Sequence, residues 1–84
     1  MYRVEIASQA ERDLNRLPAS LFDRIVPKIR ALAHDPRPNG CVKLAGSKSD
    51  YRIRVGDYRV LYQIADQVRI VRVIRVRHHL EVYR

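Results

Sequence analysis

The segment from Tyr51 to Tyr62, YRIRVGDYRVLY, constrains the fold of this chain more than any other. Apolar and charged residues alternate on both sides of Gly56-Asp57, and alternation at period two is typical of a strand with one buried face. A two-residue spacer that begins with glycine favours a type II′ turn. The segment therefore predicts a tight β-hairpin in which Val55 lies opposite Tyr58.

Counting outwards from this turn sorts the hairpin side chains onto two faces of a sheet. The core face carries Tyr51, Ile53, Val55, Tyr58, Val60 and Tyr62. The opposite face carries Arg52, Arg54, Arg59 and Leu61. Like charges directly opposed on a sheet destabilise it by about 0.2–1 kcal/mol, so the cluster favours a phosphate-binding patch whose anion offsets the repulsion. The alternative is that the arginines extend into solvent or pair with helix acids such as Glu11, Asp13 or Asp23.

Two helices are expected between a first strand, Tyr2 to Ala7, and the hairpin. Ser8 with Glu11 predicts a capping box at the start of the first helix, which Pro18 ends. The apolar positions of that helix are Ala10, Leu14 and Leu17. Ser20 is the candidate N-cap of the second helix, whose apolar stripe consists of Leu21, Ile25, Ile29, Leu32 and Ala33.

Pro27 lies inside the pattern of the second helix. An interior proline removes a backbone hydrogen bond and costs about 3 kcal/mol, so we expect a kink or a split of the helix there. The composition of HDPRPNG, residues 34–40, is that of a loop, and KLAGSKSD continues as a connection to the hairpin.

Three strands are expected from Tyr51 onwards. The hairpin covers Tyr51 to Ile64, residues 65–67 form a short turn, and Val68 to Arg77, VRIVRVIRVR, forms a β-branched strand. Because that strand carries apolar residues on both faces, we expect it in the interior of the sheet. The order βααβββ predicts a single α+β domain, residues 1–84, with two N-terminal helices packed on one face of a mostly antiparallel sheet.

The charge of the chain narrows the class of partner. Seventeen Lys and Arg against nine Asp and Glu give a formal net charge of +8, and fourteen of the cations are arginines. Such a balance indicates a polyanionic partner, most often nucleic acid, and the guanidinium group grips phosphate at two points. No apolar run approaches the roughly 20 residues of a membrane helix, no signal-peptide core is present, and Cys41 is single. We therefore expect a cytoplasmic protein with no membrane partner.

The C-terminal segment HHLEVYR adds groups that can do chemistry. His78 and His79 can take or give a proton near neutral pH. Tyr83 is either an ordinary aromatic near the terminus or a platform on which a base stacks. Glu81 is the one carboxylate near the histidine pair, so no metal site is expected.

The sequence as a whole resembles the RelE/ParE superfamily of type II toxins, nearer to its RelE branch. The resemblance runs from YRVEIASQAERDLNRLP through the DPRP loop to Tyr83, and its most specific parts are K-L-x-G, Y-R-I-R-x-G-x-Y-R-V-x-Y and H-x-x-x-V-Y. It implies a RelE-like βααβββ fold and an mRNA endoribonuclease that acts without a metal or cofactor, usually in the ribosomal A site. It also implies an acidic, RelB-like antitoxin that wraps the toxin, and binding of operator DNA by the pair of proteins together.

The resemblance also assigns roles to single residues. Arg52 and Arg54 match the two basic residues of the first hairpin strand, and Arg59 matches the arginine that contacts the scissile phosphate. Tyr83 matches the terminal tyrosine that stacks on or orients a base. The frequent His-Arg pair of the family falls on His78-His79, where a histidine replaces the arginine. Further RNA-binding candidates are Lys43, Lys48, Arg75 and Arg77.

These assignments leave the general base open. Arginine does not lose its proton in proteins, so the base implied is His78 or His79, with Tyr83 second. Two other functions remain compatible with the same resemblance. One is a ParE-like toxin that acts on DNA gyrase, and the other is a degenerate member that only binds RNA or its antitoxin.

Overall fold

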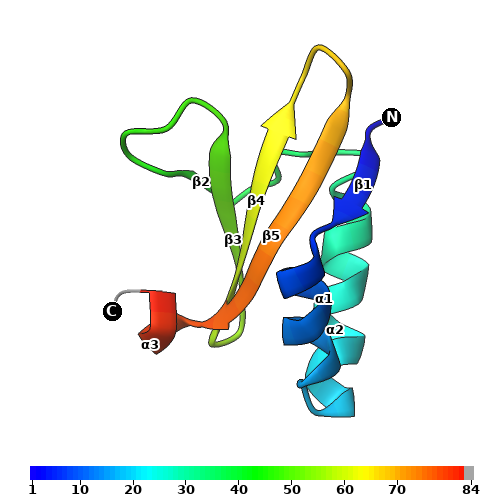
Figure 1. The fold of residues 1–84 in the computed structure, drawn as a ribbon, viewed down its shortest axis with the longest axis vertical. Helices are drawn as coiled ribbons and strands as arrows, with labels where there is room; N and C mark the ends of the chain where they lie inside the picture. Colours follow the sequence, from blue (N-terminus) through cyan, green and yellow to red (C-terminus); the bar gives the residue numbers. More distant parts are fainter. Residues whose placement is uncertain (83–84) are drawn as a thin grey trace.

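The structure, a computed structural model, describes residues 1–82 and consists of one five-stranded sheet with three helices (Figure 1). In chain order the elements are β1 (Arg3–Ile6), α1 (Ser8–Asn15), α2 (Ala19–Ala31), β2 (Val42–Lys43), β3 (Asp50–Val55), β4 (Tyr58–Ala65), β5 (Ile70–His78) and α3 (His79–Val82). The strand order is β1-β5-β4-β3-β2. The β1–β5 pair is parallel and the other pairs are antiparallel, which confirms the predicted α+β architecture.

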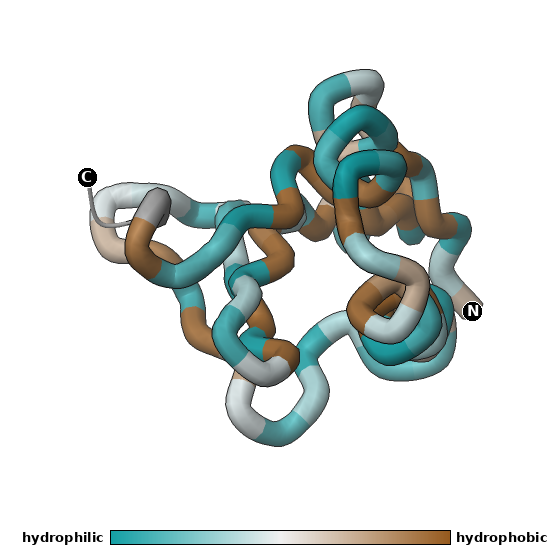
Figure 2. The backbone as a smooth tube through the Cα atoms, turned by 90° about the horizontal axis from the view of Figure 1, so that it is seen from below, coloured by the Kyte–Doolittle hydropathy of each residue, from teal (hydrophilic) through white to brown (hydrophobic). Residues whose placement is uncertain are grey.

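The core lies between one face of the sheet and helices α1 and α2, as predicted. In Figure 1 these helices lie to the right of the sheet, whereas α3 and the loop between β2 and β3 lie to its left. Figure 2 shows apolar and polar positions alternating along the strands. The buried apolar side chains are Ala10, Leu14, Ile25, Ile29, Leu32, Tyr51, Ile53, Val55, Val60, Tyr62, Ile64, Val71, Val73 and Val76.

The hairpin has the predicted register. Val55 pairs with Tyr58, and Arg54 pairs with Arg59. Gly56 adopts φ +60°, a left-handed value that favours glycine, as the glycine-first turn requires. The turn therefore fixes which side chains face the helices and which face away.

β5 lies in the interior of the sheet, as predicted, but its pattern has another cause. The preceding turn is longer than expected, so β5 begins at Ile70 instead of Val68. The register with β4 shifts between Leu61 and Tyr62, which pair with Arg75 and Val73, and Ile74 is left as the extra residue of a β-bulge. Because the bulge changes the phase of the alternation, Val71, Val73 and Val76 all lie on the core face although their spacing is not a regular period of two.

The helix starts differ from the predictions. The N-cap of α1 is Ala7, without a side-chain hydrogen bond, so the capping box of Ser8 and Glu11 is not formed. Ala7 is held extended because its N–H donates to the Val73 carbonyl and continues the pairing of β1. The N-cap of α2 is Pro18, not Ser20.

Two segments of the middle of the chain differ from the predictions, the first in that α2 is not split at Pro27. Pro27 and Asp23, whose carbonyl a regular residue at position 27 would bond, are both solvent-exposed, so water can replace the missing partner. Val42 and Lys43 form a short edge strand against β3 instead of a connection, because two residues are too few to show periodicity.

Candidate functional site

The sheet face turned away from α1 and α2 carries a row of three arginines, and we call it the open face. Arg54 of β3 pairs with Arg59 of β4, which in turn pairs with Arg77 of β5. Directly paired residues of neighbouring strands point to the same side of a sheet, so this row crosses three strands. Like charges at directly opposed positions repel one another, so such a row favours the approach of an anion.

A hollow of about 160 Å³ lies beside this row, and we call it the arginine hollow. Its lining residues are Gly40, Val42, Arg52, Arg54 and Arg59. Arg52 and Arg59 are half-buried, Arg54 is exposed, and the Nη1 atom of Arg59 is buried. The Nε of Arg54 donates to the Gly56 carbonyl at 2.7 Å, which directs this side chain back over the turn. The hollow therefore presents guanidinium donors of three arginines to an anion the size of a phosphate.

Arg75, a predicted RNA-binding residue, forms an ion pair with Asp13 of α1. Its Nε and Nη2 donate to the two carboxylate oxygens at 2.8 and 3.2 Å, and the Val76 N–H donates to the same carboxylate at 2.9 Å. Burial raises the pKa of Asp13, but the hydrogen bonds from Arg75 and Val76 and the charges of Arg75 and Arg77 outweigh it and hold the pKa below its usual value. Asp13 is thus a helix acid that pairs with β5.

The two predicted lysines lie apart from the arginine hollow. Lys43 pairs with Tyr51 in the sheet, so alternation directs it to the same side as the core residues. Lys48 is exposed in the loop between β2 and β3. Neither lysine lines the arginine hollow. Arg77 reaches the row of arginines through its register with Arg59.

The rings of the two histidines lie next to each other at the hairpin end, with centroids 4.6 Å apart. His78 pairs with Tyr58, and their rings meet edge to face with centroids 5.4 Å apart, so His78 belongs to the helix side of β5. His79 opens α3, and its N–H donates to the Asp57 carbonyl at 2.8 Å. Its Nδ1 lies 3.2 Å from the same carbonyl oxygen. His79 is therefore fixed at the hairpin turn, next to Gly56, whereas Tyr83 lies outside the described residues.

Arg24 of α2 also lies at this turn, and the sequence analysis missed it. A Cβ placed on Gly56 would lie 3.3 Å from Nη2 of Arg24. Arg24 occupies an exposed helix position, where periodicity gives no sign of a neighbour in the sheet. The turn is thus flanked by Arg24, Arg54 and His79.

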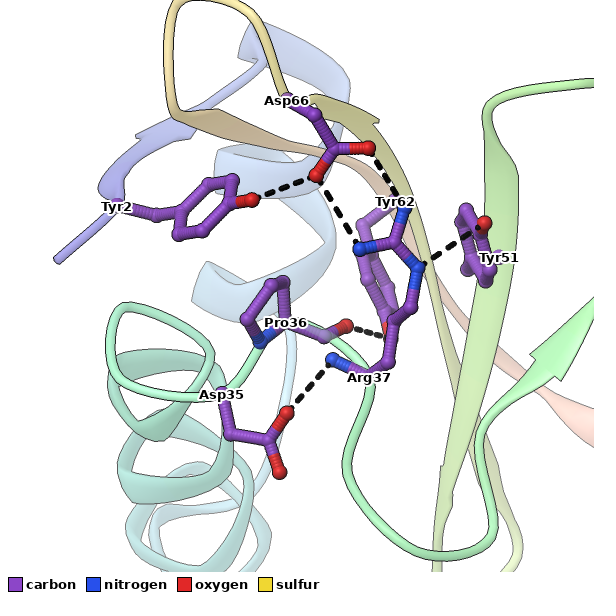
Figure 3. A network of polar contacts seen from close by, with 7 residues as sticks. All are labelled: Tyr2, Asp35, Pro36, Arg37, Tyr51, Tyr62 and Asp66. Carbon is purple, nitrogen blue, oxygen red and sulfur yellow. Dashed lines mark hydrogen bonds and ion pairs between the residues drawn. The ribbon is translucent and has the colours of Figure 1, made fainter.

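Arg37 anchors the loop that carries Gly40, and it was missed as well (Figure 3). Its Nη1 and Nη2 donate to both oxygens of Asp66 at 3.2 and 2.8 Å, and its Nε donates to the Tyr51 hydroxyl at 3.2 Å. The Tyr2 hydroxyl donates to the same carboxylate. The hydrogen bonds from Arg37 and then Tyr2 lower the pKa of Asp66 to about 2. This network ties one wall of the arginine hollow to the sheet.

Within residues 1–82, no three side chains of His, Cys, Asp or Glu cluster as they would around a metal ion. No helix in the same part of the chain is long and apolar enough to cross a membrane.

Comparison with known proteins matches residues 4–83 to the family described as ParE toxin of type II toxin-antitoxin system, parDE. Toxin RelG of Mycobacterium tuberculosis is 31% identical over 84 residues, which cover 99% of this chain and 97% of RelG. The archaeal RelE–RelB complex from Pyrococcus horikoshii aligns with a TM-score of 0.82 and 29% identity, covering 92% of this chain and 93% of that one. The E. coli RelBE toxin–antitoxin complex aligns with a TM-score of 0.79 and 26% identity over 90% and 94% of the two chains.

Proposed function

This chain belongs to the RelE/ParE superfamily of toxins of type II toxin–antitoxin systems, and from that premise we propose that it is an mRNA endoribonuclease that inhibits translation. The observation that carries the proposal is the arginine hollow. Arg52, Arg54 and Arg59 surround a space of about 160 Å³ and bring three guanidinium groups together on one sheet face. An RNA phosphate is the anion that this small, basic domain would meet.

The reaction proposed is attack of a ribose 2′-OH on the adjacent phosphorus. The bond from phosphorus to the 5′-oxygen of the next nucleotide breaks, leaving a 2′,3′-cyclic phosphate and a 5′-OH. Arg52, Arg54 and Arg59 would stabilise the extra negative charge of the phosphorane, because charge-assisted donors act most strongly where charge develops. No metal takes part in this scheme.

The proton transfers require groups other than arginine. His79 is the first candidate for the general base because it contacts the Asp57 carbonyl of the hairpin turn, and Arg54 donates to the neighbouring Gly56 carbonyl. His78 faces Tyr58 on the helix side of β5 and is the weaker candidate. Tyr83 keeps its proposed role of orienting a base. Arg77 supplies a further cation from the row, in place of the arginine that the family often has after its histidine.

The partners proposed follow from charge and from the relatives. The complexes of RelE with RelB among the similar structures support an acidic, RelB-like antitoxin that wraps this basic domain. We further propose a cytoplasmic location, action on mRNA in the ribosomal A site, and binding of operator DNA by the toxin–antitoxin complex. Lys43 and Lys48 remain proposed contacts to the RNA backbone outside the hollow.

A ParE-like gyrase inhibitor is the second candidate, favoured by the description of the matching family model. Such a toxin has no need of a phosphate-binding hollow combined with a histidine. The two functions therefore differ in whether single changes in the hollow abolish toxicity together with RNA cleavage.

The experiment is to induce the toxin without its antitoxin and to map mRNA 5′ ends. The wild type should produce new ends within codons of translated messages. Arg59→Ala and His79→Ala should each lose these ends and the growth inhibition while remaining folded by circular dichroism. Arg12→Ala, which removes an exposed arginine of α1, is the matched control and should stay toxic. Full toxicity of both site variants would reject the site, and intact mRNA with a DNA-damage response would favour gyrase.

A further inference from the structure

The two histidines of the C-terminal segment are each held through the Nδ1 atom of the ring. Both side chains are half-buried, and the planes of the two neighbouring rings are tilted by 32°. A neutral imidazole carries its proton on one nitrogen and a lone pair on the other, so the partner of one nitrogen decides what the other can do. The Nδ1 atoms of His78 and His79 have partners of opposite kinds.

The Nδ1 atom of His79 faces an acceptor. It lies 3.2 Å from the carbonyl oxygen of Asp57 in the hairpin turn. A carbonyl oxygen can only accept, so Nδ1 carries the ring proton and donates it. The lone pair of the neutral ring is then on Nε2, on the side of the ring away from that carbonyl. Among residues 1–80, whose side chains the structure describes, Nε2 of His79 makes no hydrogen bond.

The Nδ1 atom of His78 faces a donor. The N–H of Leu80 donates to it at 3.3 Å, which is the bond that an N-cap side chain makes with the second residue of a helix. The proton of the neutral His78 ring is therefore on Nε2, and its lone pair is already in use. The Tyr58 ring meets His78 at 82°, edge to face, and fixes the ring from the other side. His78 thus stabilises the start of α3, the helix that His79 opens.

The hairpin turn brings His79 to the arginines through two consecutive carbonyls. The Asp57 carbonyl accepts from both the N–H and the ring of His79. The preceding carbonyl, that of Gly56, accepts from Nε of Arg54 at 2.7 Å. One turn therefore holds a cation of the arginine hollow and a ring whose Nε2 lone pair is available.

We propose that Nε2 of His79 is the atom that takes the proton of the 2′-OH and that His78 is a positioning residue, an inference that rests on the proposed function. The O–H bond breaks and its proton moves to the Nε2 lone pair, while the oxygen forms its bond to phosphorus. The 5′-oxygen leaves with a proton from water, and the hydroxide so formed takes the proton back from Nε2. During the step, the Nδ1–H of the charged ring stays on the Asp57 carbonyl, which favours the cation.

Nitrogen-15 NMR of the histidine rings measures the two tautomers directly. The toxin carries Arg59→Ala, which should make it non-toxic, and is measured at about pH 8, where an ordinary histidine is neutral. His79 should show the Nδ1–H form, the less common one for a free histidine, and His78 the Nε2–H form. The exposed His34 serves as the internal reference. An Nε2–H form of His79 or an Nδ1–H form of His78 would overturn the proposal.

Asparagine variants separate the roles of the two rings in cleavage. The asparagine amide lies where Nδ1 lies in histidine, and nothing replaces Nε2. His79→Asn should stay folded by circular dichroism and reduce the new mRNA 5′ ends by about 100-fold or more. His78→Asn keeps an acceptor that caps α3 but removes the ring beside His79, so it should reduce these ends by only about tenfold. His34→Asn is the matched control and should leave them unchanged.

The ring signals of His79 distinguish positioning by His78 from simple capping. His78→Asn should turn the single tautomer of His79 into a mixture of both forms, and an unchanged Nδ1–H form would contradict the positioning role. Cleavage by His79→Asn, or equal losses in His78→Asn and His79→Asn, would overturn the division of roles. If the wild type produces no new 5′ ends, the proposed function is rejected together with the base role of Nε2. The NMR spectra would then still confirm or refute the opposed tautomers and the positioning by His78.

Discussion

Asp13 is the carboxylate on which the attachment of α1 to β5 depends most. It is 8% exposed and accepts three hydrogen bonds, two from Arg75 and one from the Val76 N–H. The pairing of β1 with β5 ends at Ile6 and Val73, so Asp13 accepts the N–H that a longer β1 would have accepted. We therefore predict that Asp13→Ala destabilises the fold strongly.

The loss of stability in Asp13→Ala follows from the two donors that would lose their acceptor, the Val76 N–H and the Arg75 guanidinium. The Val76 N–H would remain buried without its acceptor, at a cost of about 1–3 kcal/mol. Removing one partner of a buried ion pair costs about 3–5 kcal/mol, but the side chain of Arg75 is 31% exposed and can turn towards water. We expect a loss of about 2–4 kcal/mol, a large part of the stability of a domain of this size.

The stability that Asp13 contributes should decrease at acidic pH. The pKa of Asp13 is lower in the folded state than its unfolded value of about 3.9. Its contribution is therefore complete above about pH 4 and disappears as the pH falls through the folded pKa. The difference in unfolding free energy between wild type and Asp13→Ala should shrink on acidification.

Urea unfolding followed by circular dichroism measures these differences. All variants are made on an Arg59→Ala background, which should be non-toxic. Glu11→Ala removes an exposed acid of the same helix and should change the unfolding free energy by less than about 0.5 kcal/mol. Asp13→Asn keeps an acceptor for the Val76 N–H, so its loss of unfolding free energy should lie between those of Asp13→Ala and Glu11→Ala. If Asp13→Ala is no less stable than Glu11→Ala, the reasoning about the edge of β5 is wrong.

Two further predictions concern the turns of the sheet. Gly56→Ala should lower the free energy of unfolding by about 1–2 kcal/mol in the same urea assay. The reasons are that φ +60° is unfavourable for alanine and that the new methyl group would press on Arg24. A loss below about 0.5 kcal/mol would contradict this prediction. Asp66→Asn should weaken the attachment of Arg37, and because the pKa of Asp66 is lowered to about 2, the wild type should lose this stabilisation between about pH 4 and pH 2. Thermal unfolding of the wild type and of Asp66→Asn across that pH range measures this loss. If the difference in unfolding temperature between the two proteins does not shrink as the pH falls, the prediction is refuted.

The hairpin was predictable because each of its signals is local. The spacer Gly56-Asp57 sets the turn, the turn sets the register, and the alternation then assigns Arg52, Arg54 and Arg59 to one face. The helix caps were less predictable, because Ala7 and Pro18 cap by backbone geometry that a search for Ser and Glu does not detect.

The contacts that complete the site join residues far apart in the chain. Asp13 and Arg75 are 62 positions apart, and Arg37 and Asp66 are 29 apart. No periodicity or motif predicts such pairs. In the sequence, each partner on its own has the pattern of an ordinary surface charge. Their pairing depends on how α1 and the 34–40 loop lie against the sheet, which is a property of the packed fold.

The single extra residue of β5 decides the composition of the open face. Continuing the register of Val73 with Tyr62 without a bulge would place Val76 opposite Arg59 and Arg77 opposite Tyr58 on the core side. With Ile74 as the extra residue, Arg77 pairs with Arg59 and completes the row of arginines.

Ile74 itself lies beside Leu61 in a small hollow of the open face. A regular strand would keep Ile74 opposite Leu61 but would lose the third arginine of the row. The bulge therefore leaves the apolar surface in place and adds the charge of Arg77 to the row that Arg54 and Arg59 form.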